Sequence, residues 1–126
     1  MENETWDSLP VGTKERPRLE AKDCRVEAVE KKEVGKDGKA FTKLVLHLKH
    51  PDRESLLFVS EAKIEMRGKL MARSLFLNLD TDGKIERGSA VALLLQHYQA
   101  PIISTLVGKT VRMATDEKGY LCVKCY

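Results

Sequence analysis

Short runs of alternating apolar and polar residues, separated by turn signals, constrain this chain more than any other feature. The clearest run covers residues 41–49, where Leu44, Leu46 and Leu48 point to one face and polar residues mostly point to the other. Period two is the period of a β-strand, so these runs predict a mostly β protein. The predicted strands are residues 21–29, 41–49, 56–60, 70–79, 110–114 and 120–126.

One segment has the period of a helix instead. Ser89 is a favourable N-cap, apolar residues follow it at helical spacing, and Pro101 stops the run. The sequence therefore predicts one late α-helix over about residues 88–99, and residues 102–107 are a candidate for a further helical turn. Because the strands do not alternate with helices, a doubly wound parallel sheet is disfavoured. A small antiparallel barrel fits this order, since closure removes unpaired strand edges.

The loops between the strands contain two basic segments. Residues 31–39 form a predicted turn around Asp37 and Gly38, and residues 62–73 form an extra basic hairpin around Gly68. Residues 80–84 read as a further turn, and their weak likeness to a calcium loop lacks the flanking helices. His50 precedes Pro51 in a turn and is expected to be exposed.

Chain length and charge divide the molecule into two parts. With 126 residues, the chain is long enough for one domain, which we place at residues 20–126. Residues 1–19 contain Pro10, Gly12 and Pro17 and predict a flexible acidic tail, where Trp6 is expected to pack on the domain. Residues 1–20 carry five acids and three bases, so the remainder carries 19 bases against 14 acids.

Several classes of protein are disfavoured. No apolar run approaches the length of a membrane span, and the polar N-terminus does not resemble a signal peptide, so we expect a cytoplasmic protein with no membrane partner. The three cysteines do not suggest a disulfide framework. Cys122 and Cys125 invite a metal or redox interpretation, but on a strand they point to opposite faces, so packed thiols are favoured. No motif of catalysis is present, and we expect no enzyme activity, cofactor or metal.

The order of elements resembles an OB-fold over about residues 20–126. Residues 89–120 also resemble a feature of small phage and archaeal OB-type single-strand-binding proteins. In those proteins an amphipathic helix precedes an LVGK-x-V sequence that begins a strand, as Leu106, Val107, Gly108, Lys109 and Val111 do here. The resemblance implies a surface for oligonucleotides or oligosaccharides. The basic hairpin at residues 62–73 departs from the pattern.

Bases and aromatic residues at outward strand positions predict where such a ligand binds. Single strands bind to cations that neutralise phosphates and to flat side chains that stack on bases. The alternative is that Phe58 and Phe76 belong to the core and that the lysines are solvated surface, partly neutralised by nearby acids such as Glu30 and Glu65. The candidate contacts are Lys36, Lys39, Lys43, His47, Lys49, Phe58, Lys63, Arg67, Lys69, Arg73, Phe76, Tyr120 and Lys124.

Two functions from different classes remain. The first is non-catalytic binding of single-stranded nucleic acid, with DNA favoured over RNA. The second is a protein-interaction module or subunit of a larger complex, which docks through the Trp6 tail or a strand edge. The sequence leaves open whether the chain forms a homo-oligomer.

Overall fold

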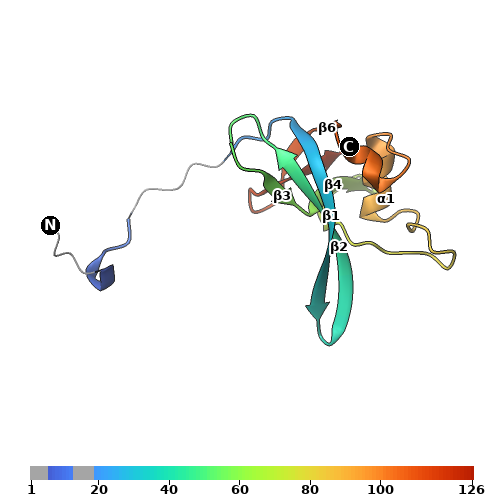
Figure 1. Cartoon of the computed structure of the whole chain (residues 1–126), viewed down its shortest axis with the longest axis horizontal. Helices are drawn as coiled ribbons and strands as arrows, with labels where there is room; N and C mark the ends of the chain where they lie inside the picture. The colour runs from blue at the N-terminus through green and yellow to red at the C-terminus, as the bar shows by residue number, and fades with distance from the viewer. Residues whose placement is uncertain (1–5, 13–18) are drawn as a thin grey trace.

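Eight strands and one α-helix make up the part of the chain that this computed structural model describes, residues 6–12 and 19–126 (Figure 1). The mostly β class with one late helix is therefore confirmed. The α-helix, Ala90–His97, is shorter than predicted, and residues 103–106 form the expected further turn as a 3-10 helix. The elements are β1 (Cys24–Lys36), β2 (Lys39–Lys49), β3 (Leu57–Val59), β4 (Glu61–Met66), β5 (Lys69–Ser74), α1 (Ala90–His97), β6 (Thr110–Val111), β7 (Met113–Thr115) and β8 (Leu121–Cys125).

The strands form two sheets that join into an OB-like barrel. The sheet orders are β3-β2-β1-β6 and β5-β4-β8-β7. β3 continues into β4 past Ser60, and β6 continues into β7 past Arg112. The chain therefore passes directly from one sheet to the other at two places. β4 and β8 pair in parallel, whereas every other strand pair in the described residues is antiparallel.

The barrel encloses one apolar core. Leu44, Leu46 and Leu48 of β2 are all buried, as their alternation predicts. Burying each leucine contributes roughly 1.5–3 kcal/mol. α1 packs against β4 and β8, and the Ser89 side-chain oxygen accepts a hydrogen bond from the Ala92 N–H at 3.2 Å. This N-cap fixes where the helix begins.

The β1–β2 hairpin is longer than the sequence predicts, and the prediction of a turn over residues 31–39 is wrong. β1 continues to Lys36, β2 begins at Lys39, and only Asp37 and Gly38 form the turn. Both turn residues have positive φ, 54° and 76°, as a two-residue hairpin requires. The hairpin extends beyond the barrel (Figure 1). Its residues 31–33 and 39–41 are exposed, so they lack the alternation that burial imposes on a strand.

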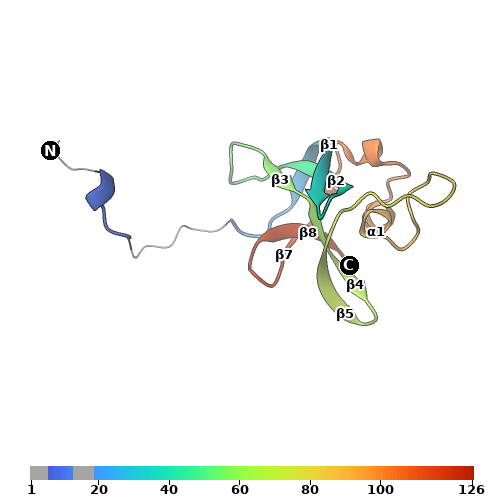
Figure 2. The same ribbon diagram turned by 90° about the horizontal axis from the view of Figure 1, so that it is seen from below.

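The basic hairpin at residues 62–73 is confirmed as β4 and β5, joined at Arg67 and Gly68. It projects from the barrel in a different direction from the β1–β2 hairpin (Figure 2). The predicted strand over residues 70–79 ends earlier than expected, at Ser74. Beyond Ser74, Phe76 makes an isolated bridge to Lys43.

His50 is fully buried, so the prediction that it is exposed is wrong. Its Nδ1 accepts a hydrogen bond from the Asp52 N–H at 3.0 Å, and its Nε2 donates to the Glu20 carbonyl at 2.8 Å. Both ring nitrogens are therefore satisfied in the neutral form. The contact ties the segment before β1 to the loop after β2.

The expectations for the N-terminal segment are not tested. Residues 1–5, residues 13–18 and the side chain of Trp6 lie outside the described part of the chain. Trp6–Ser8 form one 3-10 turn, and residues 7–12 are exposed.

Candidate nucleic-acid interface

The outward side of β2 and its neighbours carries all three phenylalanines of the chain. Since the leucines of β2 face the core, the alternate residues Phe41, Lys43 and His47 face outward. Phe76 lies opposite Lys43, and Phe58 lies opposite His47 on β3. We call these five residues the aromatic face. Phe58 is 68% exposed and Phe76 36%, so the alternative that they belong to the core is wrong.

The aromatic rings gather in two clusters. In the first, the ring centroids of Phe41 and Phe76 are 5.8 Å apart, and Lys43 Nζ lies 5.6 Å from the Phe76 centroid. In the second, the His47 and Phe58 rings meet edge to face with centroids 4.7 Å apart. Lys43 and His47 are four positions apart on β2, so the clusters are roughly 14 Å apart along the strand.

The charge around the aromatic face is mixed. Lys32 pairs with Lys43 across β1 and β2, which puts two ammonium groups beside the first cluster. His47 Nε2 lies 2.9 Å from Glu30 Oε1. The face is therefore cationic near Phe76 and more nearly neutral near Phe58.

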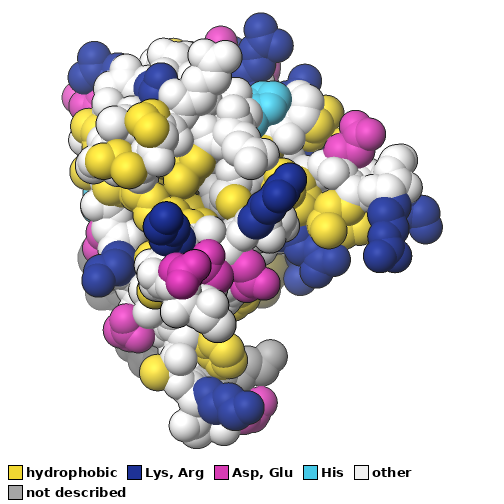
Figure 3. All heavy atoms as spheres, turned by 90° about the vertical axis from the view of Figure 1, so that its right-hand side faces the viewer, with side chains coloured by type: hydrophobic (Ala, Val, Ile, Leu, Met, Phe, Trp, Pro, Cys, Tyr) yellow, Lys and Arg dark blue, Asp and Glu magenta, His cyan; other side chains and the backbone are white. Residues whose placement is uncertain are grey.

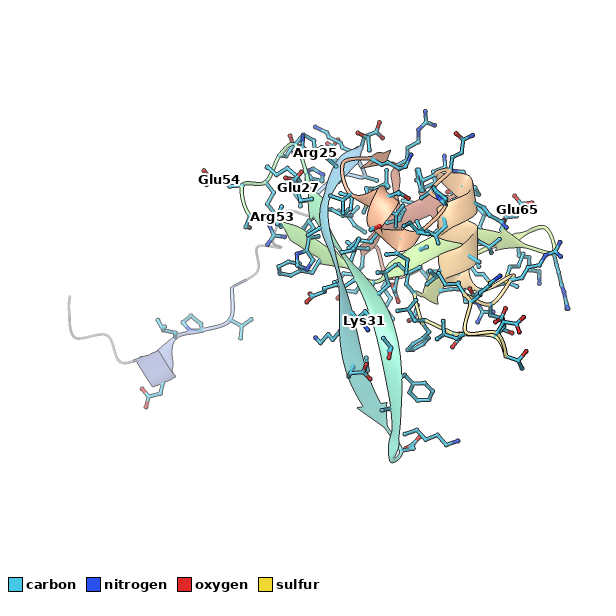
Figure 4. All side chains as sticks on the ribbon, turned by 45° about the vertical axis from the view of Figure 1, so that its right-hand side comes forward. Arg25, Glu27, Lys31, Arg53, Glu54 and Glu65 are labelled. Carbon is cyan, nitrogen blue, oxygen red and sulfur yellow. The ribbon has the colours of Figure 1, made fainter. Side chains whose placement is uncertain are left out.

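An ion pair at the start of β1 adds little charge to the surface. Arg25 Nε and Glu27 Oε2 are 2.5 Å apart, and the two side chains lie together in Figure 4. A hydrogen bond from the Arg25 guanidinium lowers the pKa of Glu27. Both groups remain charged at neutral pH and largely cancel each other.

The lysines at the two ends of β2 differ in their surroundings. Lys39 is exposed at the hairpin turn, and the side chain of Lys36 lies outside the described residues. Lys49 Nζ donates to the carbonyl of His50 at 3.0 Å and also to that of Arg53. Lys49 thus holds the β2–β3 loop, which leaves it less free to contact a ligand.

A second group of candidate residues lies on β4 and β8. Lys63 and Lys124 are register partners in the parallel pair, and Lys63 Nζ donates to the Thr115 carbonyl at 2.8 Å. Lys124 Nζ lies 4.8 Å from the ring centroid of Tyr126. Tyr120, directly before β8, is 62% exposed. This surface pairs a cation with an aromatic ring, as the first cluster does.

The structure separates the bases of the β4–β5 hairpin from the aromatic face. Arg67 and Lys69 lie at the hairpin turn, which projects away from the β1–β2 hairpin (Figure 2). Arg73 is nearer, since it and Phe76 line the same hollow of about 580 Å³. Lys and Arg side chains also lie at the ends of two projections of the molecular surface (Figure 3). The candidates therefore do not form one continuous groove.

Phe41 belongs to the aromatic face although it is not among the contacts predicted from the sequence. Phe41 is exposed and has the same strand parity as Lys43 and His47, so the alternation itself placed it on the outward face. Its partner Phe76 lies 35 positions later in the chain, and no local pattern predicts that contact.

The cysteines occupy separate environments, as their spacing predicts. Cys125 belongs to the barrel core beside Ile64, whereas Cys122 lies outside that core cluster and its Sγ approaches the Ala114 carbonyl. Burial raises the pKa of Cys122 to about 11 and that of Cys125 to about 12. Both thiols are therefore protonated near pH 7. Within residues 6–12 and 19–126, no three His, Cys, Asp or Glu side chains gather in a way that would hold a metal ion.

Comparison with known proteins gives no assignment: no family model, no curated protein and no solved structure matches the chain. In the described residues, none of the helices has both the length and the apolar character needed to cross a membrane.

Proposed function

We propose that this protein binds single-stranded nucleic acid on the aromatic face, without catalysis. The observation that carries the proposal is the pair of exposed aromatic clusters on β2 and its neighbours, with Lys32 and Lys43 beside one of them. Flat exposed rings stack on bases of any sequence, and ammonium groups neutralise the phosphates between them. An OB-like barrel supports this proposal because such barrels commonly present the same outer strands to oligonucleotides.

The mixed charge predicts moderate affinity and a modest salt dependence. A protein that neutralises few phosphates has a shallow dependence of the binding constant on salt, with a slope of about −0.7 for each phosphate on a single strand. Duplex DNA buries its bases, so it offers nothing for Phe58 and Phe76 to stack on. Duplex should therefore compete poorly.

The test is a titration of fluorescein-labelled oligo-dT, followed by anisotropy at several salt concentrations, with oligo-rU in parallel. Phe58→Ala and Phe76→Ala are each expected to weaken binding by about 1–3 kcal/mol, the contribution of one stacked base. Phe58→Leu keeps an apolar side chain and tests whether the flat ring is needed. Ile102→Ala is the control, because Ile102 is also exposed but lines a different hollow, beside α1.

Lys43→Gln should lower the salt slope by about 0.7. Failure to bind oligo-dT at low salt would refute the proposal and would favour the protein-interaction module. Equal losses in Phe58→Ala and Ile102→Ala would show that binding does not use the aromatic face.

A further inference from the structure

The β4–β5 hairpin has an open strand edge. β5 is the last strand of its sheet, and among the described residues no other strand pairs with its outer side. Lys69, Met71 and Arg73 alternate along β5 and share one face, because their partners on β4 are Met66, Ile64 and Ala62 in turn. An open edge offers backbone N–H and C=O groups to an incoming strand.

The positive charges on this edge are not neutralised within the described structure. No described residue forms an ion pair or a side-chain hydrogen bond with Arg67, Lys69 or Arg73. Glu65 lies on the same hairpin (Figure 4), but it pairs with Leu70 and therefore faces the opposite side from Lys69. The edge keeps its net positive charge.

An apolar centre lies between these bases. Met66 and Met71 line a hollow of about 400 Å³ together with Arg67, Lys69 and Arg73. Met66 is also exposed. The edge therefore fits an extended acidic peptide that carries one large apolar side chain, since methionine packs well against aromatic rings.

The N-terminus of this chain has that composition. Residues 1–9, MENETWDSL, contain three acids, no basic side chain and no proline. In an extended conformation Glu2, Glu4 and Trp6 share one face. We propose that residues 1–9 of a second copy add to the edge of β5 as a further strand, with Trp6 against Met71 and Glu4 beside Lys69 or Arg73. The single 3-10 turn at Trp6–Ser8 opens on docking, at little cost because one isolated turn has little stability.

The arrangement in space favours a second copy over the same chain. Residues 19–23 leave the barrel on the side away from the β4–β5 hairpin (Figure 2). Symmetric pairing of β5 with β5 is disfavoured, because it would bring the bases of two copies together. Docking of a tail onto a neighbour's edge builds a two-fold dimer where the two tails exchange, and otherwise a larger ring or a growing chain of copies.

The experiment uses the full chain without nucleic acid. Trp6 is the one tryptophan, so its emission reports docking directly. We expect sedimentation velocity to show association that increases with protein concentration and decreases with salt, with a parallel blue shift of Trp6 emission. Glu2→Gln/Glu4→Gln and Lys69→Gln/Arg73→Gln should each weaken association about tenfold, because each removes two charges of one sign from the proposed contact.

A mixture of the two double variants should form 1:1 pairs, because the intact tail of one variant docks on the intact β5 edge of the other. Lys31→Gln/Lys32→Gln removes the same charge from the other hairpin and should leave association unchanged. A chain that stays monomeric at every concentration overturns the proposal. So does a blue shift that does not depend on concentration, a mixture that does not associate, or an equal effect of the Lys31→Gln/Lys32→Gln control.

Discussion

Tyr98 joins the end of α1 to the seam where the two sheets meet, and its removal gives the most direct test of the barrel. Its hydroxyl accepts a hydrogen bond from the Arg112 N–H at 3.0 Å and donates to the Lys124 carbonyl. Arg112 lies between β6 and β7. The hydroxyl therefore makes the backbone hydrogen bonds that a neighbouring strand would make elsewhere in the sheets.

Tyr98→Phe keeps the ring and removes only these contacts. An unsatisfied buried group costs about 1–3 kcal/mol, and the exposure of Arg112 lets water satisfy its N–H in part, so we expect a loss of about 1 kcal/mol. For a domain of this size the melting temperature should fall by about 4 °C or more. Thermal and urea unfolding followed by circular dichroism measure both quantities.

Tyr126→Phe is the matched control, since no hydrogen bond of its hydroxyl is found among the described residues and Tyr126 is exposed. The reasoning is refuted if Tyr98→Phe is as stable as the original chain, or if Tyr126→Phe is destabilised equally.

Three further predictions follow from burial. Burial raises the pKa of Tyr98 to about 12, so the unfolded chain loses this proton first as pH rises from about 10. Stability should fall between about pH 10 and 12, less steeply in Tyr98→Phe, and equal slopes would contradict this. His50→Ala should cost about 2–4 kcal/mol in urea unfolding, because it leaves a cavity and two lost hydrogen bonds, whereas exposed His97→Ala should change little. A thiol reagent should label Cys122 and Cys125 slowly until urea unfolds the chain, and rapid labelling of the native chain would show that the thiols are accessible.

Alternation predicted the strands well wherever one face of the strand is buried. The leucines of β2 showed this because the core requires them at every second position. The outer half of the β1–β2 hairpin has no buried face, so its sequence carries no period and resembles a turn. The pairing of β4 with β8 joins segments about 60 residues apart, which no local pattern reveals.

The candidate site was predicted in part. Strand parity correctly put Lys43 and His47 on one face, because that inference depends only on neighbouring residues. It did not show that Phe76 lies opposite Lys43, nor that Arg67 and Lys69 point elsewhere, since both depend on how the chain folds over long distances. His50 was placed wrongly for the same reason, because its partner Glu20 lies 30 positions earlier.

The parallel pairing of β4 with β8 also governs when this protein can fold. β8 follows β4 by about 60 residues, and it is the strand that connects β4 to β7 and so completes the wall of the barrel. Contacts between distant segments form slowly, because the intervening loop must lose its entropy first. During synthesis, the edge of β4 that pairs with β8 stays unpaired until residues 121–125 leave the ribosome. The growing chain is therefore exposed to mispairing while the residues between β4 and β8 are synthesised, and the charged residues along β4 and β5 lie where they would discourage it.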